Sequence, residues 1–415
     1  MKIKKPNIHI FVEHKKYYLY DVNINAVVTI PYELYEFFSL WGKEDEKEIT
    51  ADIEEDISFL MEQGFLTEKK KISSIKHYET DTLKDLYMYN MGNVILQVTQ
   101  NCNLRCEYCV YSGSYINRVH TNKRMSFETA VKTIDFLAAH SLNCNEVSIG
   151  FYGGEPLLEI ELIKKAVSYA KEVFGEKKIN FNMTTNATLL NMDIADFLVQ
   201  NDFNITISLD GPRNIHNKNR IFANSNKGTF DLIMENIALI REKYPFFDKK
   251  ISFNAVIDLK QNVSCTNEFF LNYDTVKGLN VNGTFINPVN RKEILDFDPE
   301  LNAISNYEVF KVFLYACDSD LFSLYESEIA SIKQAMCERY IGVEGYEDII
   351  SPGGQCLPGI QRFFVTADGK FFPCERVDET SEELCIGDLQ QGINIDNAIK
   401  ILNVADVTSR QCIEC

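Results

Sequence analysis

The sequence predicts an α/β protein whose main part is a partial (β/α)6 barrel of the TIM type. From residue 93 onward, strand-like apolar runs alternate with helical stretches, which indicates a parallel sheet with right-handed crossovers. This alternation would also fit an open doubly wound sheet. Short glycine-rich or polar motifs follow four of the strands, however, and functional groups around one rim are typical of a barrel.

The strands are predicted from apolar and β-branched runs, and the helices from apolar residues at a helical period. The six predicted strands are Val94–Thr99, Val147–Phe151, Ile179–Thr184, Ile205–Leu209, Ile251–Ile257 and Val281–Ile286. The clearest helices are Phe127–His140 (with Ser126 as N-cap), Leu157–Phe174, Met192–Gln200 and Phe230–Lys243.

Residues 1–75 have a different pattern and predict a small α+β domain. Short strands are expected at Ile8–Val12, Tyr17–Tyr20 and Ala26–Ile30, followed by a helix from Pro31 to Phe38. A second helix, Asp52–Met61, has Ile53, Ile57, Leu60 and Met61 on one face. Gly64 ends this helix, and Phe65–Thr67 is expected to form another short strand. Residues 76–92 are predicted to be a polar linker.

Composition excludes several classes of function. The net charge of −18 argues against a general nucleic-acid binder, which would need clustered Lys and Arg. No run approaches the ~18–20 apolar residues of a membrane span, and the start lacks the apolar run of a signal peptide, so a cytoplasmic protein is expected.

The 12 cysteines are expected to bind metal or to act in catalysis, because the cytosol keeps thiols reduced. Three isolated cysteines, Cys144, Cys265 and Cys317, are predicted to be buried and inert.

Three cysteines in one short loop, Cys102, Cys106 and Cys109, are the strongest functional signal. Their C-x3-C-x2-C spacing supplies three thiolates, whereas iron–sulfur cubanes are usually held by four cysteines. The trio therefore predicts a [4Fe–4S] cluster with one iron open to another ligand. A zinc site is the alternative, but zinc prefers four ligands and paired C-x2-C units, and His120 is the one nearby candidate for a fourth ligand.

Together with three further strand-end motifs, the trio resembles the radical S-adenosylmethionine (SAM) superfamily, specifically its peptide- and protein-modifying branch. These motifs are Gly153-Gly154-Glu155-Pro156, Thr184-Thr185-Asn186 and Ser208-Leu209-Asp210-Gly211-Pro212. The resemblance implies a catalytic barrel over residues 93–310, in which Cys102, Cys106 and Cys109 bind the cluster and SAM binds its open iron.

The resemblance also implies roles in SAM binding. Gly153 and Gly154 would let the backbone approach the amine of SAM, because they lack a Cβ, and Glu155 would accept a hydrogen bond from that amine. Tyr108 would pack beside the cluster, while Ser208 and Asp210 would lie near the ribose or the carboxylate. The remaining expected SAM-binding residues are Asn186 and Arg220. The residue after Asn186 departs from the family pattern, because Ala187 stands where the common Thr-Asn-Gly has its glycine. For Arg220, a surface salt bridge is the alternative.

Residues 1–75 resemble the winged-helix peptide-recognition element of enzymes that mature ribosomally made peptides. An exposed strand edge in such an element would bind a leader peptide as an added β-strand. A purely structural cap is the alternative.

The C-terminal region, residues 311–415, resembles the SPASM extension of this branch, which binds one or two auxiliary [4Fe–4S] clusters. Cys356, Gly369 and Cys374 match the opening pattern C-x9–15-G-x4-C, and Cys412-Ile-Glu-Cys415 resembles its next element. The family pattern continues beyond this point. We therefore expect either a domain truncated at its C-terminus or further ligands at Cys337 and Cys385.

The resemblance as a whole implies an enzyme in which a 5′-deoxyadenosyl radical abstracts hydrogen from a Cys-containing precursor peptide, leading to thioether crosslinks. It also implies a flavodoxin- or ferredoxin-type electron donor. The alternatives are a radical SAM maturase that forms C–C crosslinks, epimers or formylglycine and, more distantly, a non-catalytic iron–sulfur or zinc scaffold. The sequence does not name a catalytic base or a second hydrogen donor.

Overall fold

The computed structural model describes residues 6–41, 49–68, 72–258, 263–293, 299–317, 349–351 and 356–414. These fall into two compact units. The first comprises residues 1–78, 331–354 and 403–415, and the second comprises residues 79–330 and 355–402. Within the described ranges, no helix is both long and apolar enough to cross a membrane.

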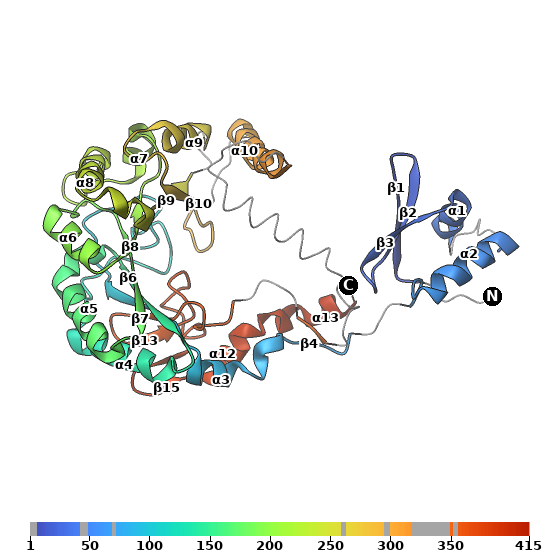
Figure 1. Ribbon diagram of the computed structural model, residues 1–415, viewed down its shortest axis with the longest axis horizontal. Helices are drawn as coiled ribbons and strands as arrows, with labels where there is room; N and C mark the ends of the chain where they lie inside the picture. Colours follow the sequence, from blue (N-terminus) through green and yellow to red (C-terminus); the bar gives the residue numbers. More distant parts are fainter. Residues whose placement is uncertain are drawn as a thin grey trace. The chain divides into compact units, whose positions relative to one another are not determined.

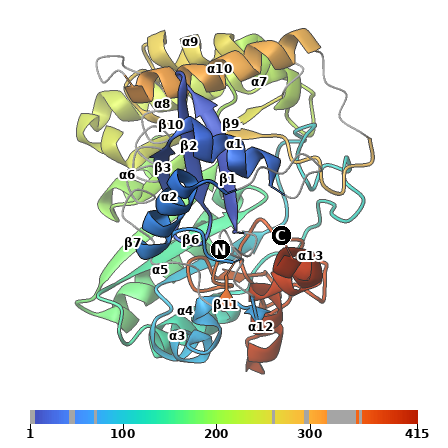
Figure 2. The ribbon, with the colours of Figure 1, turned by 90° about the vertical axis from the view of Figure 1, so that its right-hand side faces the viewer.

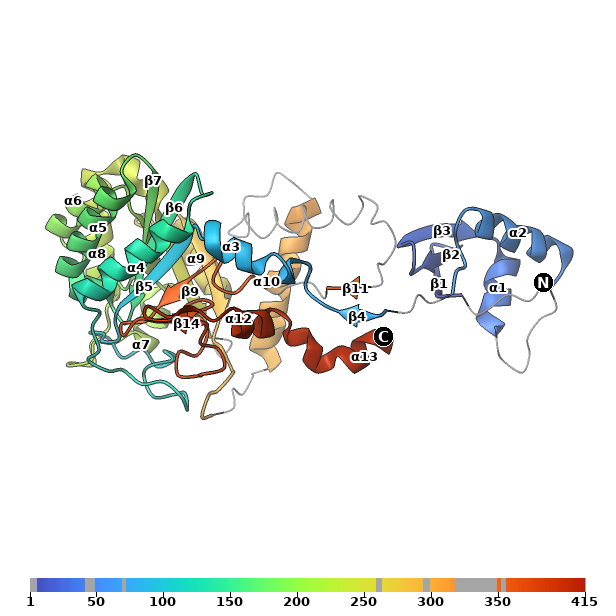
Figure 3. The ribbon, with the colours of Figure 1, turned by 90° about the horizontal axis from the view of Figure 1, so that it is seen from below.

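The N-terminal part of the first unit is an antiparallel meander with two helices. Strands β1 (Ile8–Glu13), β2 (Lys16–Asp21) and β3 (Ala26–Ile30) pair in that order. Helices α1 (Tyr32–Leu40) and α2 (Ala51–Glu62) lie on one side of the three strands (Figure 3). Leu19, Leu34, Phe37 and Ile57 form the centre of their shared core. The predicted strands and helices are confirmed here.

Two details of this unit differ from the sequence prediction. Residues 65–67 form no strand, because Leu66 adopts a left-handed backbone (φ 62°) that buries its side chain. The Leu66 N–H donates to Asp21 Oδ2 at 2.7 Å instead of joining a sheet. Met61, predicted on the buried face of α2, is 42% exposed. The first unit also contains β4 (Ser74–Ile75) paired with β11 (Ile349–Ile350), a 3-10 turn at Val404–Thr408 and α13 (Ser409–Glu414).

The second unit is built on six consecutive parallel strands. They are β5 (Asn93–Thr99), β6 (Glu146–Gly153), β7 (Lys178–Thr185), β8 (Asn204–Ser208), β9 (Ile251–Ile257) and β10 (Asn280–Phe285). Each strand pairs in parallel with the next along the chain, so the order never reverses. A doubly wound sheet requires such a reversal. The winding in one direction is that of a partial barrel, as predicted.

Helices follow the strands and lie along the outer side of the sheet (Figure 1). They are α4 (Phe127–His140), α5 (Ile160–Phe174), α6 (Met192–Gln200), α7 (Arg213–Asn219), α8 (Phe230–Lys243) and α9 (Val263–Asn272), with 3-10 turns at Pro156–Glu159 and Pro245–Lys250. Helix α10 (Pro299–Cys317) lies beside α9 (Figure 2). Ser126 caps α4 as predicted, since its hydroxyl accepts a hydrogen bond from the Thr129 N–H.

The C-terminal segment extends this sheet beyond β5. Strand β12 (Phe364–Val365) pairs in parallel with β5, and β13 (Lys370–Phe372), β14 (Gly387–Asp388) and β15 (Gly392–Ile393) continue in antiparallel order. Phe364 and Phe372 pack on Ile95 of β5, and α12 (Ile395–Leu402) follows. The C-terminal segment therefore lies beside the first strand of the barrel.

Two further predictions do not match the structure. Residues expected in a polar linker form a 3-10 turn (Tyr78–Thr80) and helix α3 (Leu83–Tyr89), whose Leu83 and Tyr87 are buried in the main core. Cys265, expected to be buried, is exposed because α9 turns Val263, Thr266 and Phe269 inward. Cys144 is half-buried, and the side chain of Cys317 lies outside the described residues.

Candidate functional site

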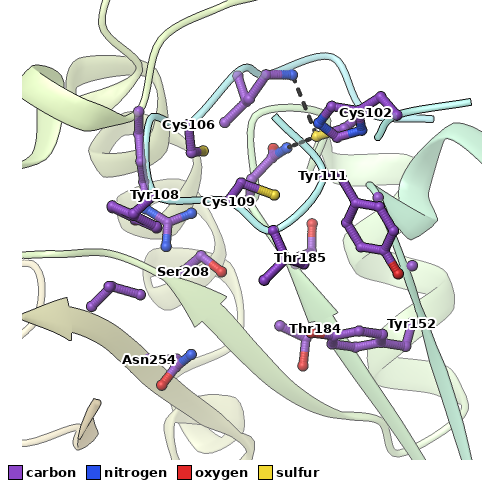
Figure 4. Close-up of a pocket in the computed structure, with 18 residues that line it drawn as sticks. Cys102, Cys106, Tyr108, Cys109, Tyr111, Tyr152, Thr184, Thr185, Ser208 and Asn254 are labelled. Atoms are coloured by element: carbon purple, nitrogen blue, oxygen red, sulfur yellow. Dashed lines mark hydrogen bonds between the residues drawn. The ribbon is translucent and has the colours of Figure 1, made fainter. Parts of the chain in front are cut away.

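A cavity of about 270 Å³ lies at the carboxyl ends of strands β6 to β9 and beneath the cysteine loop. We call it the cysteine cavity, because Cys102, Cys106 and Cys109 all line it. Figure 4 shows the three cysteines along the loop, with Thr184, Thr185, Ser208 and Asn254 facing them from the strands. The structure thus brings the strand-end motifs to one site, as the barrel prediction requires.

The cysteine loop is held in place by backbone hydrogen bonds. The Cys109 N–H donates to the Cys106 carbonyl at 3.1 Å, and the Arg105 N–H donates to the Ile221 carbonyl at 2.9 Å. Cys106 is buried, and Cys102 and Cys109 are half-buried. Within the described part of the chain, no three Cys, His, Asp or Glu side chains converge as a single metal ion would require. A cubane differs, because each thiolate binds a different iron.

Burial makes these thiols hard to ionise in the absence of metal. Desolvation raises the pKa of both Cys102 and Cys106 to about 12. Near Cys102 the Glu155 carboxylate adds to this effect, whereas near Cys106 the Arg220 guanidinium opposes it. Since the thiolate is the form that binds metal, the positive charge of bound iron is what would hold these sulfurs ionised.

Gly153 and Gly154 allow the end of β6 to touch the cysteine loop. A Cβ on Gly153, whose φ is 138°, would lie 2.0 Å from the Thr99 carbonyl oxygen. A Cβ on Gly154 would lie 2.0 Å from the Asn101 carbonyl oxygen. Both glycines line the cysteine cavity, so their backbone faces any ligand there. The sequence predicted that the backbone of these glycines approaches SAM closely. In the structure the same backbone also approaches the cysteine loop closely.

Glu155 lies behind the cavity wall rather than in it. Its Oε1 accepts hydrogen bonds from the Leu157 N–H (3.0 Å) and the Thr185 hydroxyl (2.7 Å), and its Oε2 accepts from the Asn186 N–H (2.7 Å). Burial raises the pKa of Glu155, and these hydrogen bonds oppose the rise. The structure therefore gives Glu155 a role in tying β6 to β7, and its expected hydrogen bond with the SAM amine stays a prediction.

Asn186 lines the cavity and connects the third motif to the cysteine loop. Its amide donates to Asn103 Oδ1 at 2.9 Å and approaches Cys102 Sγ at 3.9 Å. Its Oδ1 accepts from the N–H of Thr188 at 3.0 Å. Ala187 has a left-handed backbone (φ 58°), the conformation that the glycine of the common Thr-Asn-Gly pattern adopts without strain.

Arg220, Asp210 and Tyr108 of the cysteine loop form a connected group. Arg220 Nε donates to Asp210 Oδ2 at 3.0 Å, and the Tyr108 hydroxyl donates to the same oxygen. Burial opposes the charge of Arg220, but Asp210 outweighs it and raises the pKa of Arg220 well above its usual value. Arg220, Tyr108 and Ser208 line the cavity, whereas the buried Asp210 does not. The Arg220 pair is therefore internal and not the surface salt bridge considered as an alternative.

A ring of hydrogen bonds supports this group from behind. The Asp210 N–H donates to His216 Nδ1 at 3.3 Å, His216 Nε2 lies 2.8 Å from the Thr229 hydroxyl, and that hydroxyl donates to the Arg220 carbonyl at 3.3 Å. This pattern fits a neutral His216 that carries its proton on Nε2. Burial lowers the pKa of His216 to about 3, which keeps it neutral.

The sequence reasoning missed several residues of the cavity wall. They are Leu104, Val110, Tyr111, Tyr152, Asn254 and Val256. Thr184 and Thr185 belong to the third motif but had no predicted role, and His120 was considered only as a zinc ligand. Tyr152 directly precedes the Gly153-Gly154 motif, and this neighbouring position was the signal that could have identified it. Asn254 and Val256 come from β9, which carries no motif.

The C-terminal cysteines occupy several segments. Cys356 is exposed and Cys374 is half-buried, and their segments are joined by a hydrogen bond from the Gly359 N–H to the Pro373 carbonyl at 3.2 Å. Cys385 packs beside Phe364 and Phe372, and its thiol lies 3.3 Å from the Gly387 carbonyl, which favours a structural thiol. Cys412 belongs to the first unit, and Cys337 and Cys415 lie outside the described residues.

The described residues fit an iron–sulfur cluster with a bound small molecule. Three thiols offer soft ligands, and glycine backbone, hydroxyls, an amide and a guanidinium in the same lining offer polar contacts. Residues 96–269 match the family model of the radical SAM superfamily. The chain contains a radical SAM domain. The cofactors of this superfamily are a [4Fe–4S] cluster and SAM, in agreement with the sequence prediction.

Two curated relatives are similar to most of this chain. A cysteine-type anaerobic sulfatase-maturating enzyme of Clostridium novyi is 28% identical over 69% of the chain and 74% of its own length. The radical SAM cyclopropyl synthase TigE of Paramaledivibacter caminithermalis is 22% identical over 88% of the chain and 75% of its own length.

A solved structure shares the fold of the radical SAM protein. The enzyme anSMEcpe with bound AdoMet has a TM-score of 0.56 and 20% identity, over 74% of this chain and 80% of its own.

Proposed function

We propose that this chain is a peptide maturase that forms thioether crosslinks at cysteine residues of a ribosomally made precursor peptide. One observation carries the proposal. The cysteine cavity gathers three thiols, the Gly153–Gly154 backbone and Arg220 in a radical SAM domain. The same chain carries a small α+β unit, in which one edge of the three-stranded sheet is unpaired within the described ranges.

The residues of the chain have distinct roles in this proposal. Cys102, Cys106 and Cys109 hold the cluster, and the Gly153–Gly154 backbone and Arg220 orient SAM. When bound, the cluster and SAM supply one-electron chemistry that removes a hydrogen atom from carbon. The apolar side chains around the cavity exclude water that would divert reactive species.

The N-terminal unit is proposed to recognise the leader of the precursor. Among the described residues β3 pairs only with β2, so its other edge offers free N–H and C=O groups to an added strand. The start of β1, in contrast, is next to residues 67 and 68, since the Asn7 N–H donates to the Thr67 carbonyl. A precursor without its leader is expected to remain unmodified by the full-length protein.

Auxiliary clusters form a further part of the proposal. Cys356 and Cys374 are the first expected ligands, with Cys412 and Cys415, and Cys337 is kept as a candidate. Cys385 is the weakest candidate because of its packing and its contact with Gly387. A flavodoxin- or ferredoxin-type protein is the proposed electron donor.

Co-expression with a Cys-rich precursor peptide tests the reaction. A C–S bond replaces one C–H bond and one S–H bond, so the peptide mass should fall by two hydrogens per crosslink. The same cysteines should also resist alkylation. A Cys102→Ala variant is the control and should leave the peptide unchanged. Modified peptide with unchanged mass would contradict thioether formation and favour epimerisation.

A second candidate is oxidation of a protein cysteine to formylglycine. The 28% identity to a cysteine-type sulfatase-maturating enzyme, over 74% of that enzyme, favours it. Formylglycine formation converts the –CH2–SH group of the target residue to –CHO, so the sulfur leaves as sulfide, an oxygen comes from water and two hydrogens are lost by oxidation. Its mass change therefore separates it from a crosslink in the same experiment.

A further inference from the structure

A second cavity, of about 310 Å³, lies at the carboxyl ends of β5 and β12. Its wall comes from the stretch after the cysteine loop, including Tyr111, Arg118 and Lys123, and from the C-terminal segment, including Asp368 and Glu379. Tyr111 lines both this cavity and the cysteine cavity. The two cavities are therefore neighbours that share one side chain as a wall.

Glu379 lies at the inner end of the second cavity, and one of its carboxylate oxygens accepts no hydrogen bond. Its side chain is 6% exposed, and Oε1 accepts hydrogen bonds from the Tyr111 hydroxyl and from Gln97 Nε2. Oε2 is buried and accepts no hydrogen bond, although Arg118 Nε lies 3.3 Å away. A buried carboxylate oxygen without a donor is costly, so this position is suited to a donor from a ligand.

The charges around Glu379 favour a positive ligand. Arg118, which is 9% exposed, lies 3.6 Å from Asp378 and 3.3 Å from Glu379. Burial opposes the charge of Asp378, but hydrogen bonds from Thr380 and Asn117 hold its pKa below the usual value. One cation therefore faces two carboxylates, and the inner end of the cavity carries a net charge of −1.

The mouth of the second cavity is balanced and open. Lys123 Nζ lies 3.2 Å from Asp368 Oδ2, and both side chains are about half exposed. Lys370 and Glu382 also line this cavity, with opposite charges. The charges outside the inner end therefore balance and give no electrostatic preference to an incoming group. The charge preference for a ligand therefore depends on the inner end, where Glu379 and Tyr111 separate the two cavities.

We propose that the second cavity binds a lysine or arginine side chain of the substrate peptide, next to the residue modified in the cysteine cavity, with Glu379 Oε2 accepting its hydrogen bond. The inference rests on the proposed peptide substrate. Such a side chain supplies both the missing donor and the missing positive charge.

A peptide selection tests this assignment. The reconstituted full-length protein with SAM is used to capture short random peptides that carry one central cysteine. This selection measures binding at the two cavities and does not require the leader-dependent modification. The wild type should enrich Lys or Arg at a fixed spacing from the cysteine. Glu379→Gln should reduce that enrichment at least about tenfold, because a hydrogen bond between charged groups is lost. Glu172→Gln, the same change at an exposed position on α5, should keep it.

A second experiment changes the peptide instead of the protein, so that the test remains decisive if Glu379→Gln misfolds. A low iron content of the variant would reveal such misfolding. The enriched peptide is resynthesised with norleucine in place of the basic residue, which removes the charge at similar length. Its affinity for the wild type should fall about tenfold. Absence of basic enrichment, or equal affinity of both peptides, would overturn the subsite. Failure of the wild type to cleave SAM would instead refute the proposed function.

Discussion

The hydroxyl of Thr229 offers a sharp test of how the cavity wall is held. Thr229 is the N-cap residue of α8, yet its side chain makes no helix-cap hydrogen bond. It instead links His216 Nε2 (2.8 Å) to the Arg220 carbonyl (3.3 Å). Thr229→Val preserves the shape of the side chain and removes both hydrogen bonds.

The structure sets the size of the effect. His216 and Thr229 are fully buried, so water cannot replace the lost partner. An unsatisfied buried polar group costs about 1–3 kcal/mol. Because the second bond is long, we expect a loss of ~2 kcal/mol in the free energy of unfolding. If all of this free energy is lost from the contact between Arg220 and SAM, because Arg220 is displaced, affinity for SAM should fall by up to ~30-fold.

Thr229→Ser is the matched control, because it keeps the hydroxyl and removes one buried methyl group at ~1 kcal/mol. Urea denaturation measures stability, and equilibrium dialysis of labelled SAM with the reconstituted protein measures affinity. Thr229→Val should lose SAM affinity while Thr229→Ser retains it. Equal SAM affinity of the two variants would refute the idea that this ring positions Arg220.

Three further predictions follow from the fold and the site. Gly154→Ala should reduce stability by ~1–3 kcal/mol and reduce iron incorporation, because its Cβ would lie 2.0 Å from the Asn101 carbonyl oxygen; Gly92→Ala, with its Cβ 3.4 Å from Cys144 Sγ, should differ little from wild type. Burial lowers the pKa of His216 from 6.5 to about 3, so the unfolded chain binds more protons in this window and the free energy of unfolding should fall as pH is lowered from 6.5 toward 3. His216→Gln should show a shallower pH slope in denaturation titrations, and an unchanged slope would contradict the neutral His216. Cys374→Ser should lower the iron content of reconstituted protein if an auxiliary cluster is present, whereas Cys144→Ser should not; equal iron in both would count against that ligand.

The barrel was predictable because its information is local. Five of the six strands have apolar residues in a run or at alternate positions, and β10 (Asn280–Phe285) is the more polar exception. The cysteine loop, Gly153–Gly154 and Asn186 stand at or directly after strand ends. Hydrophobic periodicity and strand-end motifs therefore locate both the sheet and one rim.

The remainder depends on contacts between distant residues. Strand β12 has only two residues, and nothing in Phe364–Val365 indicates a partner at Ile95 and Leu96. Asn254 reaches the cavity from a strand without a motif, and the second cavity needs the C-terminal segment to lie beside β5. At Leu66 the sequence predicted a strand that the structure does not form. The backbone there is left-handed, and the Leu66 N–H donates to Asp21.

The most direct test of the central claim is SAM cleavage by a variant with Cys102, Cys106 and Cys109 all changed to Ala. Anaerobically reconstituted and reduced wild-type protein should convert SAM to methionine and 5′-deoxyadenosine. The triple variant should lose this activity, together with the iron bound by the cysteine loop. Formation of 5′-deoxyadenosine by the triple variant would contradict a cluster in the cysteine cavity as the site of SAM chemistry.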